Sequence, residues 1–102
     1  MWYVSDMKPS QALKHHRLAV LKAAKQFRAT NLRVFGSAQT QSESEDSDLD
    51  LLVDALPGAT LFDLGGLQDE LQELLGLRVD LVTPADLPPK FRATVLSEAK
   101  PI

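Results

Sequence analysis

Residues 34–54 read VFGSAQTQSESEDSDLDLLVD, and this stretch decides the fold that we expect for the chain. An apolar run ends at a Gly36-Ser37 turn, and ten residues later a second apolar run begins with Asp48, a leucine and Asp50. Alternate residues of a strand point to the same face, so the two aspartates should project side by side. Adjacent carboxylates repel each other unless a cation lies between them, and Mg²⁺ prefers such hard oxygen ligands.

The Gly-Ser turn supplies the complementary chemistry. Gly36 exposes backbone N–H groups and Ser37 adds a hydroxyl at the end of the first strand, which suits an anion such as phosphate. Together with the aspartates, these groups indicate half of a metal-plus-triphosphate site. The alternative is a solvated edge strand whose acids discourage aggregation. The apolar continuation at 51–53 favours a buried strand instead.

A third acid interrupts a later apolar run, Arg78-Val79-Asp80-Leu81-Val82. An isolated acid in a short strand is more often structural. Beside the first pair of aspartates, we favour a functional role for Asp80. If the two strands are neighbours in register, the three carboxylates converge on one patch.

The remaining chain alternates between helices and strands. We expect helices at 11–28 (after an N-cap at Ser10), 36–41, 61–75 and 90–98, and strands at 32–35, 48–54 and 78–82, with a loop at 42–47. Thr60 and Asp63 resemble a capping box for the helix 61–75, and Gly76 should end it. That helix contains Gly65 and Gly66, which predict either fraying or the close approach of another group. In the last helix, Phe91, Val95 and Leu96 should face inward.

These elements predict an α/β (α+β two-layer) domain with a three-stranded sheet and helices mainly on one face. Periodicity alone leaves the strand order open. We expect residues 1–9 to form a flexible lead-in, in which the aromatic Trp2 and Tyr3 either contact a partner or fray, and residues 10–102 to form the single domain. His15 and His16 point about 100° apart on a helix, so we do not expect them to share a metal ion.

The composition excludes several classes of function. The 102 residues contain 44% hydrophobic and 25% charged residues and no cysteine, which excludes disulfides and a thiol nucleophile and agrees with a cytoplasmic protein. No apolar run is long enough for a membrane span. The net charge of −3 argues against strong nucleic-acid binding.

On the Gly36-Ser37 turn, the ten-residue spacer, the Asp48-x-Asp50 pair and the later Asp80, the chain resembles the minimal nucleotidyltransferases of the DNA polymerase beta superfamily. The resemblance covers roughly residues 8–100 and implies a mixed sheet. It also implies that Asp48, Asp50 and Asp80 are catalytic and bind two Mg²⁺ ions, and that Gly36 and Ser37 bind the phosphates of ATP. Asp80 would accept the proton of the attacking hydroxyl.

Many such small proteins are MntA-like antitoxins, whose partner is a HEPN-family toxin. The resemblance therefore implies adenylyl transfer from ATP to a hydroxyl, in this branch a tyrosine of the toxin. One segment departs from the family pattern: Ala38-Gln39-Thr40-Gln41 stands where many relatives carry a basic residue, then Arg and Gly. The missing arginine favours an alternative, a catalytically weak or inactive antitoxin that neutralises its toxin by binding. Lys90, Arg92, Arg33 and Arg78 are candidate substitutes.

A third reading is nucleotide transfer to a small molecule such as an aminoglycoside, which family analogy alone supports. The acceptor, the nucleotide base and homo-oligomer formation stay open at this level.

Overall fold

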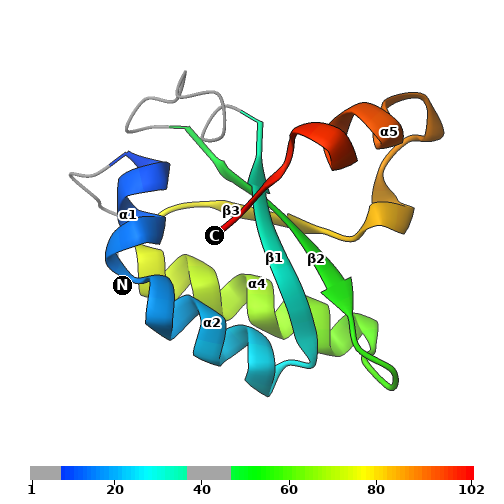
Figure 1. The fold of residues 1–102 in the computed structure, drawn as a ribbon. Coiled ribbons are helices and arrows are strands. Elements are labelled where there is room, and N and C mark those ends of the chain that lie inside the picture. Colours follow the sequence, from blue (N-terminus) through cyan, green and yellow to red (C-terminus); the bar gives the residue numbers. More distant parts are fainter. Residues whose placement is uncertain (1–7, 37–46) are drawn as a thin grey trace.

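The computed structural model describes residues 8–36 and 47–102 (Figure 1). Its elements are α1 (Pro9–His15), α2 (Arg17–Gln26), β1 (Ala29–Phe35), β2 (Leu49–Ala55), α4 (Leu61–Leu75), β3 (Val79–Val82), the 3₁₀ turn η1 (Pro84–Asp86), α5 (Pro89–Glu98) and β4 (Lys100–Pro101). The helix expected at 36–41 and the loop expected at 42–47 lie almost wholly outside the described residues. In the described part of the chain, no helix is long and apolar enough to cross a membrane.

The sheet is mixed, as expected, but has four strands in the order β3-β2-β1-β4 instead of three. β2 runs parallel to β3 and antiparallel to β1, and the short β4 pairs with the outer edge of β1. The fourth strand contains two residues, too few for an alternating pattern to reveal.

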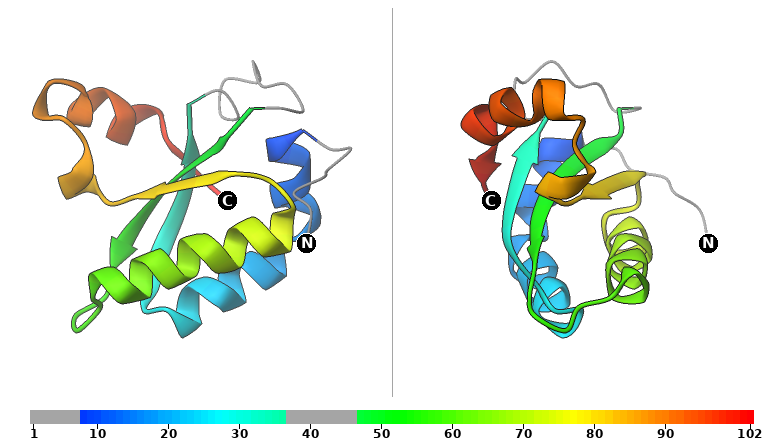
Figure 2. Two further views of the ribbon diagram at one scale, coloured as in Figure 1. Left: turned by 180° about the vertical axis from the view of Figure 1, so that it is seen from behind. Right: turned by 90° about the vertical axis from the view of Figure 1, so that its right-hand side faces the viewer.

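Helices α1, α2 and α4 cover one face of the sheet, and α5 lies on the other side (Figure 2). The main core is formed between the sheet and the first three helices, because alternate residues of β2 face them. Leu49, Leu51 and Val53 of β2 are completely buried there, together with Leu67 and Leu71 of α4. The even-numbered residues of β2 therefore face the opposite side, where the aspartates lie.

Helix α4 has the predicted bounds, Leu61–Leu75. The Thr60 hydroxyl accepts a hydrogen bond from the Asp63 amide at 3.3 Å, and the Asp63 carboxylate accepts one from the Thr60 amide at 2.9 Å. Gly76 ends the helix with a φ of 69°, the left-handed conformation that glycine adopts without strain. The capping box and the C-terminal glycine predicted from the sequence are both confirmed.

The two glycines inside α4 have different environments. A Cβ added at Gly66 would lie 2.7 Å from Cε1 of the Phe27 ring, which packs against the helix. A Cβ added at Gly65 would meet no atom within 4 Å. The close approach at Gly66 is therefore a side chain, and Gly65 serves no packing purpose in the described structure.

The single helix expected at 11–28 is in fact two helices, because His16 leaves the helical conformation with φ −105° and ψ 20°. The first helix also begins earlier than expected, at Pro9 after an N-cap at Lys8. Proline favours the first helical position, where its missing N–H costs nothing. The rings of His15 and His16 meet edge to face, with their centroids 4.7 Å apart.

The prediction that the last helix buries Phe91 and Leu96 is wrong. These side chains are 55% and 38% exposed, and α5 contains no buried residue. The helix is instead held by Arg92, whose guanidinium donates hydrogen bonds to the carbonyls of Pro84 and Leu87, both at 2.9 Å. Polar contacts to the preceding turn thus replace the apolar face that the sequence pattern indicated.

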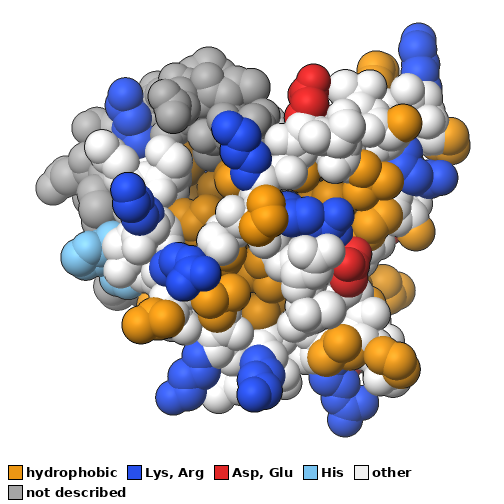
Figure 3. Space-filling view, viewed as in Figure 1, with side chains coloured by type: hydrophobic (Ala, Val, Ile, Leu, Met, Phe, Trp, Pro, Cys, Tyr) orange, Lys and Arg blue, Asp and Glu red, His pale blue; other side chains and the backbone are white. Residues whose placement is uncertain are grey.

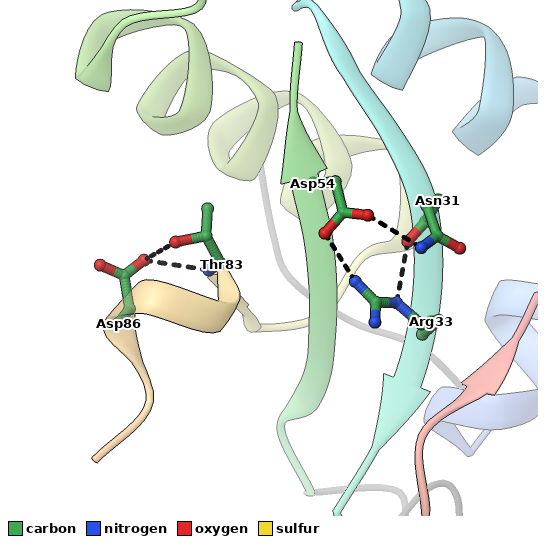
Figure 4. A network of polar contacts seen from close by, with 5 residues as sticks. All are labelled: Asn31, Arg33, Asp54, Thr83 and Asp86. Carbon is green, nitrogen blue, oxygen red and sulfur yellow. Dashed lines mark hydrogen bonds and ion pairs between the residues drawn. The ribbon is translucent and has the colours of Figure 1, made fainter. Parts of the chain in front are cut away.

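One extra residue in β1 sets the register of the sheet. Thr30 pairs with Asp54 whereas Arg33 pairs with Leu52, so β1 contains a bulge around Asn31, which has a φ of 53°. Figure 4 shows the contacts that hold it: Asp54 accepts hydrogen bonds from the Asn31 amide at 2.9 Å and the Arg33 guanidinium at 2.8 Å. Because of this extra residue, Leu32 and Val34 face the helices. Without it, the alternation of the strand would place both side chains on the opposite face of the sheet.

The glycine pair of α4 gives a matched test of packing. Gly65→Ala should stabilise the protein by about 0.5–1 kcal/mol, because alanine loses less backbone entropy in a helix. Gly66→Ala should destabilise it by about 0.5–2 kcal/mol, since overpacking against Phe27 outweighs the same gain. Urea unfolding of both variants measures the difference. Equal stabilisation by both substitutions would contradict the packing of Phe27 on Gly66.

Candidate active site

Two of the predicted aspartates lie side by side on adjacent strands. Asp50 of β2 and Asp80 of β3 are directly paired in the parallel register, and residues paired in this way project from the same face of a sheet. That face is the one turned away from α2 and α4, because the flanking Leu49 and Leu51 point into the main core. The expectation that the two strands are neighbours in register is therefore confirmed.

Asp48 comes immediately before β2 and shares its face with Asp50 by the two-residue alternation of extended chain. The amide of Leu49 donates a hydrogen bond to the carbonyl of Arg78 at 2.9 Å, which continues the β2–β3 pairing to this end. Asp48 and Asp80 are exposed, and Asp50 is half-buried. The acids thus lie at one end of the sheet, where the exposed Asp48 and Asp80 are accessible to a ligand.

The three carboxylates interact electrostatically. Burial of the Asp50 carboxylate, followed by repulsion from the carboxylates of Asp80 and Asp48, raises the pKa of Asp50 above its ordinary value of 3.8. Neighbouring negative charges disfavour ionisation, and a cation between them would remove that cost. The charge of this donor set suits a divalent cation with oxygen ligands.

The described side chains do not form a finished metal cage. Among residues 8–36 and 47–102, no three His, Cys, Asp or Glu side chains are grouped closely enough to hold an ion as they stand. Asp48 is exposed and lies before the first residue of β2, so its rotamer is not dictated by packing. The strand register fixes Asp50 relative to Asp80, and the third ligand would be brought in by side-chain rotation.

Gly36 follows the last residue of β1 and lies against the acids. Its φ is 73°, and a Cβ at this position would overlap Oδ2 of Asp50 and lie 3.2 Å from Cγ. Phe35, the residue before it, is paired with Asp50 across the antiparallel β1–β2 register. Only glycine therefore fits, both because of the positive φ and because of the carboxylate. Ser37, predicted to bind phosphate, and the segment 38–41 lie outside the described residues.

The structure also reveals the roles of two arginines that the sequence offered as substitutes for the missing loop arginine. The Arg33 side chain is only 13% exposed and is paired with Asp54 at 2.8 Å. Arg92 donates to backbone carbonyls near η1. Lys90 lies over the Phe91 ring, with its Nζ 5.7 Å from the ring centroid. The fourth candidate is Arg78, whose backbone carbonyl accepts a hydrogen bond from the amide of Leu49, the residue between Asp48 and Asp50.

The sequence analysis did not predict that Asp54 binds Asn31 and Arg33. The available signal was an asparagine in front of an apolar run, since asparagine tolerates a positive φ better than most residues. Nothing in the sequence indicated that its partner is the acid at the far end of β2.

Comparisons with known proteins agree with this geometry. A family model described as "Nucleotidyltransferase domain" matches residues 17–102. The protein adenylyltransferase MntA of Thermococcus cleftensis is 42% identical over 72 residues, which are 71% of this chain and 73% of the relative.

Two solved structures are similar as well. One, titled as a minimal nucleotidyltransferase, has a TM-score of 0.85 and 43% identity, covering 97% of this chain and 100% of the other. The second, a toxin–antitoxin crystal structure with AMP-PNP, has a TM-score of 0.67 and 21% identity, covering 80% and 68%. The first supports both fold and family, and the second supports the fold alone.

Two substitutions on the same strand should change stability in opposite directions. A raised pKa means that the folded protein binds the Asp50 proton more tightly than the unfolded chain, so the ionised carboxylate costs stability at neutral pH. Asp50→Asn should therefore raise the melting temperature at pH 7 in metal-free buffer. The gain should shrink as the pH falls through the raised pKa toward 3.8, where the wild-type carboxyl becomes protonated.

Asp54→Asn is the matched control, because it removes one charge from the same strand but weakens the contacts to Arg33 and Asn31. It should destabilise the protein by about 1–2 kcal/mol at pH 7. Calorimetric melting between pH 3.5 and 8 checks both expectations. A lower melting temperature for Asp50→Asn at pH 7 would show that the ionised Asp50 carboxylate does not destabilise the folded protein.

Proposed function

The chain belongs to the nucleotidyltransferase domain family and is an enzyme of that class, and from this premise we propose that it transfers the adenylyl group of ATP to a hydroxyl of a partner protein. The observation that carries the proposal is the direct pairing of Asp50 with Asp80 beside Gly36. A half-buried carboxylate with a raised pKa, next to two more acids, has no purpose in stabilising the fold.

The residues at this end of the sheet fit a divalent cation, because they offer several carboxylate oxygens at a site where negative charge is already unfavourable. We assign Asp48, Asp50 and Asp80 as the ligands of two Mg²⁺ ions. When bound, the ions neutralise the triphosphate and make the attacking hydroxyl more acidic.

The reaction forms one bond and breaks one bond. The oxygen of the acceptor hydroxyl attacks the α-phosphorus of ATP, the bond from that phosphorus to the β-phosphate bridging oxygen breaks, and pyrophosphate leaves. The hydroxyl proton passes to the carboxylate of Asp80, which is exposed at the edge of the sheet and can reach an incoming group.

The backbone beside the acids has a separate role. Gly36 leaves the Asp50 carboxylate uncovered, and its lack of a side chain would let a phosphate approach the strand end closely. We assign Ser37 as a second phosphate contact because it follows Gly36 directly. Positioning and charge neutralisation would then do most of the catalytic work, as is usual in phosphoryl transfer.

The acceptor is proposed from the relatives. The similar MntA is named a protein adenylyltransferase, and two structural neighbours come from toxin–antitoxin assemblies. We therefore propose that this chain is an antitoxin, that its partner is a HEPN-family toxin and that the modified group is a tyrosine hydroxyl. Modification of the toxin would be the means of neutralisation.

A second candidate function is neutralisation by binding alone. The observation in its favour is that Arg33 and Arg92, two candidates to replace the loop arginine, are held by Asp54 and by backbone carbonyls. Loss of a charge-assisted phosphate contact costs about 1.5–3 kcal/mol, equivalent to roughly a 10- to 150-fold slower reaction. On this reading, Asp50→Asn would still neutralise the toxin.

The acids should be required for label transfer. With ATP labelled at the α-phosphate, Mg²⁺ and the product of the neighbouring reading frame as acceptor, Asp50→Asn and Asp80→Asn should each reduce transfer at least about 100-fold. EDTA should abolish transfer, and added Mg²⁺ should restore it. Gel autoradiography of the acceptor measures the label.

Asp69→Asn is the control for this experiment, because it removes one charge from an exposed position on α4. Its transfer should stay within about two-fold of wild type, as for most surface substitutions away from a site. If Asp50→Asn and Asp80→Asn transfer as well as Asp69→Asn, the catalytic assignment is wrong. If wild type transfers nothing yet binds the acceptor, the second candidate function replaces the first.

A further inference from the structure

The face carrying α1, α2 and the outer edge of β1 is basic, although the chain as a whole has a net charge of −3. Residues 8–28 contain six Lys and Arg residues and neither Asp nor Glu: Lys8, Lys14, Arg17, Lys22, Lys25 and Arg28. Figure 3 shows this face, where Lys and Arg side chains surround apolar surface and few acids are visible. The acids of the proposed active site lie on the opposite side of the sheet, so this surface is separate from it.

Two hollows lie along this face between the helices and β1. The first, of about 280 Å³, is lined by Ser10, Leu13, Lys14, Arg17, Val34 and Ile102. The second, of about 310 Å³, is lined by Leu21, Ala24, Lys25, Ala29, Thr30, Asn31, Leu32 and Leu56. Both have apolar floors and at least one cation in the lining.

The two hollows follow a single stripe of the helix pair. Their α1 and α2 residues recur at spacings of three and four, from Ser10 through Arg17 to Lys25, which is one side of a helix. We call this stripe and the adjoining edge of β1 the basic groove.

We propose that the basic groove is a docking site for an acidic amphipathic helix of a partner protein. Such a helix would place one apolar side chain in each hollow, and its flanking carboxylates would meet Lys14, Arg17 and Lys25. Apolar anchors in pockets ringed by charged groups are the usual source of interface affinity.

Nucleic acid fits the same charges less well. Recognition of single-stranded RNA depends on stacking of bases against aromatic or arginine planes, and none of the described residues that line the two hollows is aromatic. A second copy of this chain also fits less well. A basic groove that met the acidic face of another copy would form a head-to-tail contact, whereas most homo-oligomers associate through the same patch on both subunits.

The docking site can be tested without ATP, so its outcome is independent of the proposed catalytic activity. The probe is a fluorescein-labelled 18-residue helical peptide with leucines on one face and glutamates on the other. The full-length chain should bind it at least ten-fold more tightly than a matched peptide with lysine in place of every glutamate. Fluorescence anisotropy at 50 and 200 mM salt measures both affinities, and binding should weaken at the higher salt.

Three variants locate the binding site. Lys14→Glu with Arg17→Glu should weaken peptide binding at least ten-fold, and Leu56→Ser, at a side chain 40% exposed in the second hollow, at least three-fold. Lys90→Glu on α5 is the control for a charge reversal elsewhere and should stay within two-fold. Circular dichroism melting of each variant establishes that the fold is intact.

Several results would overturn the proposal. Peptide binding that all the variants leave unchanged would place the interaction elsewhere. A 12-nucleotide uridine RNA that bound the groove more tightly than the peptide would make it a nucleic-acid site. Self-association of the chain in sedimentation, lost in Lys14→Glu with Arg17→Glu, would make the occupant a second copy.

Discussion

The whole arrangement depends on how Asp54 holds the bulge in β1. Its carboxylate accepts hydrogen bonds from Asn31 and Arg33, and these contacts keep one extra residue in β1 (Figure 4). A shift of one residue exchanges the two faces of a strand, so the bulge decides that Leu32 and Val34 meet the helices. The same register brings Phe35, and with it the Gly36 turn, opposite Asp50. A polar contact at one end of the sheet thus positions the candidate site at the other.

The second constraint is that one strand serves two purposes. Leu49, Leu51 and Val53 of β2 are completely buried against the helices, and their burial offsets the electrostatic cost of Asp50 on the other face of the same strand. The pKa of Asp50 is raised by burial and by the acids beside it, which is the electrostatic sign of that cost. Functional sites commonly carry such unfavourable local energies, and the well-packed opposite face of the strand offsets this one.

Charge is divided between the two sides of the molecule. Residues 8–28 contain Lys and Arg but neither Asp nor Glu. The paired Asp50 and Asp80 of β2 and β3 lie on the far face of the sheet. The small net charge of −3 does not reveal this division. A domain of this kind can present a negative face to a cation-bound nucleotide and a positive face to an acidic protein at once.

The sequence by itself determined the elements whose signals are local: α4 with its capping box and Gly76, and the buried character of β2. It failed where distant residues decide the outcome. The pairing of the two-residue β4 with β1 and the contact of Arg33 with Asp54 both join segments that are far apart in the chain. Only the tertiary structure decided that Asp50 lies beside Asp80, because strand order and register arise from the packing of the whole sheet and not from any one segment.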